Sequence, residues 1–447
     1  MAEEKHIFIH NFGCQMNLHD ARRMEEVLRP LGYTPTSRAD EADLIVVNTC
    51  SVRDKVQAKV LTALGRYAQL KERNPRLVVG VAGCVAQQEG ERLFKAAPCL
   101  DLILGPDHIA ALPRLLEQVA SGRSAQVGFV DVDDYTFLRA APRAGGEGPT
   151  ALVTIQKGCD NHCAYCIVPL VRGPEVSRPL DDVVGEVEDL VAAGVKEVTL
   201  IGQNVNSYRG DAGRDGDFVR LLRRVDAVPG LQRLRFTTSH PRDFSSSLSA
   251  CFGELPRLCP WLHLPVQSGA NPVLASMNRG YTREGYLRAV REVRQVRPDL
   301  SIGTDLIVGF PGERADDFQE TLSLVEEIQF DYSFSFKYSV RPGTAAAQLL
   351  DDVPEEEKSR RLTALQACQD RITRGRLAAR VGQRLEVLVE GWSRRGQPQL
   401  SGRTPGNQVV NFESRGDVAT GMLVEVRITE AGSHSLMGEL QGAPEAG

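Results

Sequence analysis

The sequence predicts an α/β fold in three parts: an N-terminal parallel-sheet α/β domain, a central partial (β/α)6 barrel and a small C-terminal OB-like β-barrel. Short apolar runs alternate with helical patterns over residues 1–138 and again over residues 150–378, which indicates parallel sheets covered by helices. Residues 139–149 are rich in Gly, Pro and Ala and indicate a linker. Over residues 379–443 the pattern changes to short β segments separated by turn residues, which is typical of a small barrel.

The N-terminal domain is expected to alternate strands and helices. Its strands are predicted at Lys5–His10, Ala42–Asn48, Arg76–Ala82 and Leu100–Leu104. Its helices are predicted over Asn17–Leu31, from the second strand to about Glu72, and between the third and fourth strands. Because the carboxyl ends of parallel strands share one edge of a sheet, the residues that follow these strands are expected to lie close together.

Six further strand–helix units predict an open or partial barrel rather than a complete one of eight. The six strands are predicted at Leu152–Gln156, Glu197–Ile201, Arg233–Thr238, Trp261–Val266, Ser301–Val308 and Asp331–Tyr338. A charged amphipathic helix over Pro354–Arg380 is expected to leave this domain. The C-terminal barrel is expected to contain five strands, at Gln383–Glu390, Gln399–Arg403, Gln408–Phe412, Leu423–Thr429 and Ser435–Leu440.

The chain has 447 residues and a formal net charge of −5, so any contact with RNA must come from local basic patches rather than from overall charge. No apolar run approaches the roughly 20 residues that cross a bilayer, and the N-terminus lacks the pattern of a secretory signal. We therefore expect a cytoplasmic protein with no membrane segment, and we expect a monomer. Because disulfides are disfavoured in a reducing compartment, the ten cysteines indicate metal ligation or catalysis.

Three cysteines with C-x3-C-x2-C spacing follow the first barrel strand, in the segment GCDNHCAYC: Cys159, Cys163 and Cys166. Three thiolates leave one iron of a [4Fe–4S] cluster without a protein ligand, and such an iron can bind a substrate or cofactor. A zinc site is the alternative, but structural zinc favours four ligands and paired C-x2-C units. His162 could supply the fourth ligand, although its place between two cysteines favours a solvent-facing side chain.

Three more cysteines each follow a predicted strand of the N-terminal sheet: Cys14, Cys50 and Cys84. Nearby helix N-termini favour an anionic cluster, and Gly13 and Gly83 allow close approach of the backbone. The alternative is that these are inert buried cysteines, which are common, but three equivalent strand ends favour a second cluster. The remaining cysteines lack this placement and are interpreted as structural: Cys99, Cys251, Cys259 and Cys368.

The segment GCDNHCAYC and its place after the first barrel strand resemble the radical S-adenosylmethionine (SAM) superfamily. The resemblance implies that the open iron binds SAM and that reductive cleavage releases a 5′-deoxyadenosyl radical. It also implies SAM contacts from the cysteine loop and from the carboxyl ends of later strands, where a structural hydrogen bond or turn is the alternative for each residue. The candidates are Tyr165, Gln203, Asn204, Gln267, Ser268, Ile307, Gly309 and Glu313, with His263 in the same segment as Gln267.

The order of the domains resembles the methylthiotransferase family from about His6 to Leu440. The segments that carry the resemblance are GCQMN, VVNTCSVR, VAGCVAQ, RGPEVSRP and LHLPVQSGAN. Two others, LIGQNVNSYRG and SGRTPGNQVVNF, resemble the MiaB type, which methylthiolates tRNA. The chain departs from the usual pattern at Asn11-Phe12, where Thr-Tyr or Thr-Phe is usual, and at Ala21, where Ser is common; neither touches a proposed ligand.

This resemblance implies a [4Fe–4S] cluster on each thiol triplet, two clusters in all, and conversion of N6-isopentenyl-adenosine, at tRNA position 37 and immediately 3′ of the anticodon, to its 2-methylthio derivative. SAM would donate the methyl group and also generate the radical. The implied partners are tRNA through its anticodon stem-loop, an electron donor such as a flavodoxin or ferredoxin, and a sulfur source.

The C-terminal segment resembles a TRAM domain, and OB-like barrels bind single-stranded nucleic acid through basic and aromatic residues. The candidate RNA contacts are Arg394, Arg395, Arg403, Asn407 and Phe412, with a solvated face as the alternative. Three alternatives remain for the whole chain: a methylthiotransferase acting on a protein aspartate, an iron–sulfur RNA-binding regulator, and a zinc-binding structural protein.

Overall fold

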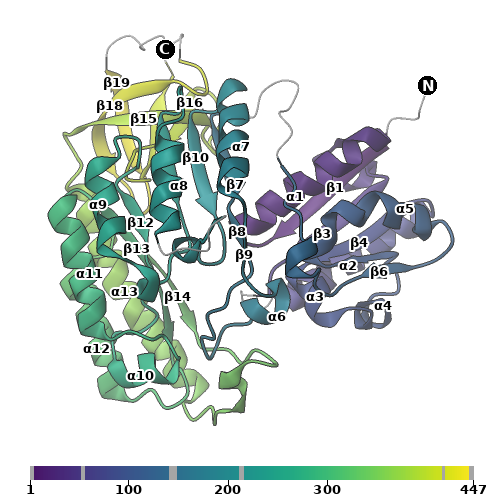
Figure 1. The fold of residues 1–447 in the computed structure, drawn as a ribbon, viewed down its shortest axis with the longest axis horizontal. Coiled ribbons are helices and arrows are strands. Elements are labelled where there is room, and N and C mark those ends of the chain that lie inside the picture. Colours follow the sequence, from purple (N-terminus) through teal and green to yellow (C-terminus); the bar gives the residue numbers. More distant parts are fainter. Residues whose placement is uncertain (1–4, 52–55, 140–147, 211–215, 415–417, 442–447) are drawn as a thin grey trace.

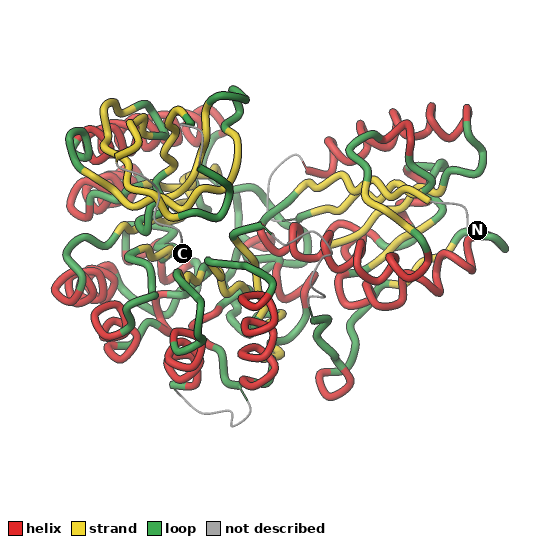
Figure 2. Tube along the Cα trace, turned by 90° about the horizontal axis from the view of Figure 1, so that it is seen from above, coloured by secondary structure: helices red, strands yellow, loops and turns green. Residues whose placement is uncertain are grey.

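The computed structural model describes residues 5–51, 56–139, 148–210, 216–414 and 418–441. The chain forms two bodies that lie side by side (Figure 1): the N-terminal domain, and the central barrel with the C-terminal domain stacked on it. Figure 2 shows the same two bodies from above. Most of the predicted linker lies outside the described residues, and the domain boundaries remain predictions. Among the helices of the described ranges, none is long and apolar enough to cross a membrane.

The N-terminal domain is a six-stranded parallel sheet. In spatial order its strands are β2 (Tyr33–Pro35), β1 (Lys5–Phe12), β3 (Leu44–Thr49), β4 (Val78–Gly83), β5 (Leu102–Leu104) and β6 (Ser124–Gln126). Its helices are α1 (Gln15–Leu28), α2 (Val56–Arg73), α3 (Cys84–Glu89), α4 (Arg92–Ala96) and α5 (Leu112–Val119). Every residue of β3 is buried, because apolar clusters cover the sheet on both faces. The predicted parallel sheet is confirmed, although the two edge strands β2 and β6 were not predicted.

The central domain has six parallel strands in two sheets of three. One sheet contains β7 (Thr150–Thr154), β10 (Glu197–Ile201) and β11 (Arg233–Phe236); the other contains β12 (Trp261–His263), β13 (Ser301–Val308) and β14 (Tyr332–Lys337). A single parallel bridge between Leu234 and Leu258 spans the break between the sheets. Around the strands lie α7 (Leu180–Ala192), α8 (Asp217–Asp226), α9 (Ser246–Glu254), α10 (Asn271–Ser276), α11 (Arg283–Val296) and α12 (Ala315–Ile328) (Figure 1). The predicted partial barrel is confirmed.

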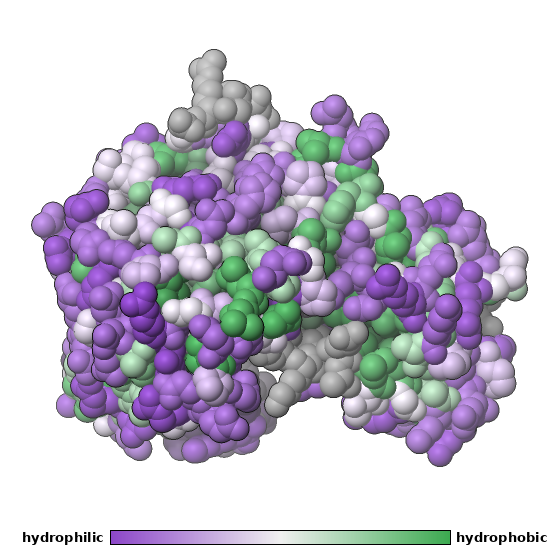
Figure 3. Space-filling view, turned by 90° about the horizontal axis from the view of Figure 1, so that it is seen from below, coloured by the Kyte–Doolittle hydropathy of each residue, from purple (hydrophilic) through white to green (hydrophobic). Residues whose placement is uncertain are grey.

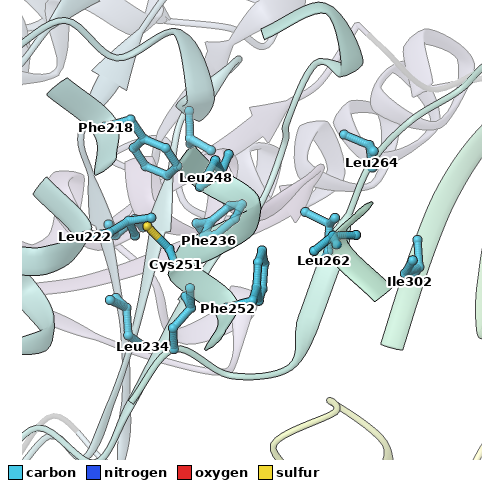
Figure 4. Packing of buried hydrophobic residues seen from close by; sticks show 14 of the residues in the cluster. Phe218, Leu222, Leu234, Phe236, Leu248, Cys251, Phe252, Leu262, Leu264 and Ile302 are labelled. Atoms are coloured by element: carbon cyan, nitrogen blue, oxygen red, sulfur yellow. The ribbon is translucent and has the colours of Figure 1, made fainter. Parts of the chain in front are cut away.

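Apolar side chains fill the space between the barrel strands and the outer helices (Figure 4). Phe236 of β11 is fully buried between Phe218 of α8 and Phe252 of α9, with ring-centroid distances of 5.2 and 5.8 Å. Cys251 packs in the same cluster and is fully buried, which supports its interpretation as structural. This packing fixes the strand ends from which the site is built.

Helix α13 (Glu355–Ala378) forms where the amphipathic helix was predicted, and it packs along the barrel before the chain enters the C-terminal domain. Leu365 and Ile372 are buried in the barrel core. Gln369 donates a hydrogen bond of 2.8 Å to the backbone carbonyl of Phe330, which precedes β14. The apolar stripe of this charged helix therefore covers the outer face of the last barrel strand.

The C-terminal domain is a closed five-stranded barrel, as predicted. The strand order is β15 (Arg384–Trp392), β16 (Gln399–Arg403), β17 (Val409–Glu413), β19 (Leu436–Gln441) and β18 (Leu423–Ala431). It docks on the central barrel through Arg235 of β11, which donates to the carbonyl oxygens of Thr404 and Pro405 at 2.8 and 2.7 Å. The small barrel thus covers the end of the central barrel at which the strands begin.

Candidate active site

One edge of the N-terminal sheet gathers three thiols, as the sequence predicted. The parallel register aligns the last residues of β1, β3 and β4, so the cysteines that follow are neighbours: Cys14, Cys50 and Cys84. Cys14 is exposed, whereas the other two are buried. Gly83 has φ of +87°, and a Cβ there would lie 2.4 Å from the carbonyl oxygen of Thr49, so only glycine allows this close approach.

A buried network of asparagine side chains holds this edge. Asn17 of α1 donates to the side chain of Asn48 at 3.2 Å and to the carbonyl of Thr49 at 2.8 Å. Asn48 in turn donates to the side chain of Asn11 at 2.9 Å. The backbone N–H of Cys14 donates to Asn17 at 3.3 Å. The loop after β1 is therefore tied to the end of β3.

The charges around these thiols favour thiolates. A hydrogen bond with Cys50 lowers the pKa of Cys14 to about 6, and the charge of Arg172 acts in the same direction. Burial lowers the pKa of the Arg172 guanidinium, but Asp20, Cys84 and Cys14 outweigh that effect and raise it well above its usual value. The positive charge of Arg172 therefore lies beside both Cys14 and Cys84. A positive charge in this place stabilises the thiolate form of a cysteine.

The second thiol triplet lies on the loop between β8 (Gln156–Lys157) and α6 (Val168–Arg172). The base of this loop is closed, because β8 pairs in antiparallel fashion with β9 (Val176–Ser177). Gly158 opens the loop with φ of +73°, and a Cβ there would lie 1.9 Å from the carbonyl oxygen of Pro174. The two arms of the loop can approach this closely only at a glycine.

The three cysteines of this loop lie near one another in a buried environment. Burial raises the pKa of Cys159 to about 11 and that of Cys166 to about 12, and the neighbouring thiols act in the same direction. Cys163 lies 3.2 Å from Nη1 of Arg279 and 3.8 Å from Nε2 of His240. Buried thiols of this kind become thiolates when a metal supplies the compensating positive charge.

Arg279 and His240 were not predicted from the sequence. Arg279 is 4% exposed and also donates to the carbonyl of Pro265 at 2.8 Å and to the hydroxyl of Tyr281 at 3.0 Å. Arg279 and His240 reach Cys163 from positions 116 and 77 residues away along the chain. No local sequence pattern marks such residues, since only the closure of the barrel brings them to the loop.

Helix α6 connects the two thiol triplets. It begins two residues after Cys166, and Ile167 and Val171 pack against Cys84 in a small buried cluster. Cys84 is the first residue of α3, and Figure 1 shows α3 and α6 side by side between the two bodies. Ile167, which is next to Cys166 of the barrel triplet, therefore packs against Cys84 of the N-terminal triplet.

Two buried ion pairs cross the same junction. Arg172 of α6 donates to Asp20 of α1 at 2.7 Å, with both side chains 7% exposed. Lys157 of β8 donates to Asp107 at 2.6 Å, with side chains 4% and 3% exposed. Each pair joins the N-terminal domain to the cysteine loop of the barrel, so the two triplets are held at a fixed separation.

Several predicted SAM contacts lie around the cysteine loop. Gln203 accepts a hydrogen bond of 2.5 Å from the backbone N–H of Gly158, and Asn204 donates to Asp243 at 2.7 Å. Within the described part of the chain, the buried Oδ1 of Asn204 has no hydrogen-bond partner. Five other candidates or neighbours lie at the strand ends or against the apolar cluster beside the loop: Tyr165, Gln267, Ile307, Gly309 and Ala164. Contact with SAM remains a prediction for these residues.

Two of the candidates make the structural hydrogen bonds that the sequence left open as the alternative. Ser268 is fully buried, and its hydroxyl accepts from the backbone N–H of Ala270 at 3.2 Å. The Glu313 side chain has no exposed surface, and its carboxylate accepts from Gly309 N–H and from Arg361, each at 2.6 Å. Both side chains therefore stabilise loops at the strand ends, and their contact with SAM remains a prediction.

The predicted RNA contacts of the C-terminal barrel separate into three groups. Phe412 is fully buried in the barrel core, so the prediction that it contacts RNA is wrong. Arg403 donates to Asn407 at 3.1 Å and pairs with Glu390, beside the segment that docks on the central barrel. Arg394 and Arg395 are exposed in the turn between β15 and β16 and are the candidates with free surface.

The donor set suits iron–sulfur clusters. No three His, Cys, Asp or Glu side chains in the described ranges lie close enough together to hold a single metal ion. His162 is exposed on the cysteine loop. Each triplet offers three thiols, and thiolates are the ligands of [4Fe–4S] clusters.

Comparisons with known proteins agree with this architecture. Residues 6–105 match the uncharacterized protein family UPF0004, residues 153–325 match the radical SAM superfamily, and residues 378–440 match the TRAM domain. A solved structure of the radical SAM methyltransferase TsrM from Kitasatospora setae, with cobalamin and a [4Fe–4S] cluster, has a TM-score of 0.56. It is 16% identical and covers 77% of this chain and 74% of its own. The fold and the cysteine loop thus define a protein of the radical SAM class.

Full-length relatives place the chain within that class. The tRNA-2-methylthio-N(6)-dimethylallyladenosine synthase of Geobacter sulfurreducens is 49% identical over 98% of each chain. The protein of the same name from Geobacter metallireducens is 51% identical over 98% of this chain and 99% of its own. The chain therefore belongs to the tRNA-2-methylthio-N(6)-dimethylallyladenosine synthase family.

Proposed function

We propose that this protein is a radical SAM methylthiotransferase that converts N6-dimethylallyladenosine at position 37 of tRNA to its 2-methylthio derivative. The observation that carries the proposal is the convergence of two thiol triplets at one junction, where Ile167 and Val171 of the barrel pack on Cys84. One cluster site would generate the radical, and the other would carry the sulfur to be inserted. The names of the full-length relatives support this substrate.

The residues fit two [4Fe–4S] clusters. Cys159, Cys163 and Cys166 would hold the cluster that binds SAM, and the N-terminal triplet would hold the second. When bound, these groups supply an open iron for SAM, a 5′-deoxyadenosyl radical and a site for sulfur. The chain supplies orientation: Arg279 fixes Cys163, and Gln203 and Asn204 place polar groups beside the cysteine loop.

The overall reaction replaces one bond at the adenine C2 atom. The C2–H bond breaks and its hydrogen leaves in 5′-deoxyadenosine, while a C2–S bond forms to a methylthio group. One SAM donates the methyl group, and a second SAM is cleaved between carbon and sulfur after accepting one electron. The methylthio sulfur gives up one electron as it bonds to C2. This electron balances the one that SAM accepts, so the overall reaction consumes no net electron.

The reaction requires partners that the chain does not contain. We propose tRNA as the substrate, with Arg394 and Arg395 of the TRAM domain among its phosphate contacts. A flavodoxin or ferredoxin would supply electrons, and a separate sulfur source would renew the sulfur. We further propose that the protein acts in the cytoplasm as a monomer.

Nucleoside mass spectrometry tests the proposal. The protein is reconstituted with iron and sulfide under anaerobic conditions and supplied with SAM, a reductant and a prenylated anticodon stem-loop. We expect 5′-deoxyadenosine and the 2-methylthio nucleoside. Replacing the three N-terminal cysteines by alanine, which yields C14A/C50A/C84A, should stop thiolation and spare SAM cleavage. The matched barrel variant C159A/C163A/C166A should abolish both, and thiolation by either variant would contradict the assignment.

A further inference from the structure

The last strand of the barrel presents aromatic side chains to open space. On β14, Lys337 contacts Ser359 of α13 at 3.3 Å, so the face of the strand that carries its serines and lysine is the outer one. The aromatic residues alternate with these and face the barrel interior. Phe334 and Phe336 are nevertheless 54% and 41% exposed. The barrel interior is therefore open beside this strand.

The rings on the neighbouring strands close that interior at the level where the strands begin. Tyr332 lies across Gly303 of β13, where a Cβ would be 1.9 Å from the tyrosine ring. The same ring stacks with Trp261 and His263 of β12, at centroid distances of 6.5 and 6.3 Å. Three aromatic residues thus form a floor, and the open space lies between this floor and the cysteine loop.

Polar groups on the neighbouring strands border the same space. Asp305 of β13 is the register partner of Phe334, and its carboxylate lies 3.1 Å from Nε2 of His263. Phe334 meets the His263 ring edge-on at 6.4 Å. Ile307 lies on β13 two residues after Asp305, toward the end of the strand, and is the register partner of Phe336. The interior has an apolar wall on β14 and a polar pair on β12 and β13.

Hydrophobic side chains also gather on one face of the molecule. Figure 3 views the molecule from the side on which α6 and α10 lie, and it shows hydrophobic residues near the centre of a largely hydrophilic face. Exposed apolar surface of this kind, with polar residues around it, is typical of a binding site.

We propose that Phe334 and Phe336 bind the dimethylallyl group of the substrate adenosine, with Phe334, which lies next to the Tyr332 floor, as the principal contact. This inference rests on the proposed function and names the residues that recognise the prenyl group. A purine that carries a branched five-carbon group at N6 needs polar partners for the base and an apolar wall for the alkyl group. Within the described residues, the space above the Tyr332 floor offers both. Burial of the alkyl group against the exposed rings removes apolar surface from water on both partners.

Two anticodon stem-loop RNAs that differ only in the dimethylallyl group test the inference. The Kd of each is measured by fluorescence anisotropy with the anaerobically reconstituted, full-length protein, and kcat/KM for thiolation is measured by nucleoside mass spectrometry. We expect the wild-type protein to prefer the prenylated RNA. The F334A variant should lose about 10- to 100-fold of that preference, the range that a few methylene groups contribute to discrimination. Its affinity for the unprenylated RNA should be unchanged.

Matched variants keep the test independent of folding. F334L retains an apolar side chain and should keep most of the preference, whereas F334N should behave like F334A. V296A removes an apolar side chain that is 40% exposed on α11 and should leave the preference unchanged. Because Phe334 is half exposed, its replacement leaves no internal cavity of the kind that unfolds a core.

The outcomes separate the inference from the proposed function. If the wild-type protein fails to thiolate the prenylated RNA, both the proposed function and the inference that rests on it are refuted. If wild-type protein thiolates and F334A keeps its full preference for the prenyl group, only the inference is overturned. An equal loss of affinity for both RNAs also overturns it, because that result indicates a structural role.

Discussion

The replacement of Asp20 by Asn tests whether a buried ion pair holds the two thiol triplets at a fixed separation. Asp20 on α1 and Arg172 on α6 belong to different domains, lie 2.7 Å apart and are each 7% exposed. Asn has nearly the same size as Asp, so the variant removes a charge with little change in packing. The guanidinium of Arg172 then stays buried without its carboxylate, and such a loss costs about 3–5 kcal/mol.

We expect D20N and R172M each to lower the free energy of the first unfolding transition by about 3 kcal/mol. The double variant D20L/R172M should recover most of this loss, because two apolar side chains leave no buried charge. The control is E254Q, which breaks the pair between Glu254 and Arg223. Their side chains are 50% and 55% exposed, so this change should have a much smaller effect than D20N.

The measurement is urea-induced unfolding of the metal-free protein, followed by circular dichroism. The metal-free form is used because a cluster beside Arg172 would contribute its own negative charge. Since a chain of several domains does not unfold in one step, each transition is fitted separately. If D20N costs no more than E254Q, the reasoning that this pair holds the domains together is refuted.

Three further predictions concern the barrel. Burial raises the pKa of Glu175 from 4.5 to about 7. Its stabilising contribution is therefore complete below pH 4.5 and is lost as the pH rises through 7. Because the side chain is only half-buried, about 1–2 kcal/mol is involved. E175Q should therefore raise the thermal midpoint at pH 8 but not at pH 4, whereas E188Q, at an exposed position on α7, should do neither. F236A should lower the free energy of unfolding of the barrel by about 3–5 kcal/mol, measured by chemical denaturation, since Phe236 is fully buried. G158A should reduce the iron and sulfide bound after reconstitution, because its Cβ would strike the carbonyl of Pro174; normal iron content would contradict this account of the loop.

The sequence predicted most of the fold because the relevant signals are local. Alternation of apolar runs and helices indicated both parallel sheets, and turn residues between short β segments indicated the small barrel. The edge strands β2 and β6 escaped prediction because their three-residue sequences, YTP and SAQ, contain no apolar run. The sequence indicated α13 as a charged amphipathic helix, whereas only the structure shows that its apolar stripe packs on the barrel.

The two cysteine triplets were indicated by the sequence, one by spacing within a single loop and one by position after equivalent strand ends. The chemistry of their surroundings was not. Phe412 lies in a β pattern whose inward and outward faces the sequence does not distinguish, and the structure places it in the core. Arg172 and Asp20 meet across 152 residues, and Arg279 reaches Cys163 across 116. Spacing in a loop and alternation along a strand are short-range properties of the chain, whereas the pairing of buried charges depends on which surfaces the folded domains bring together.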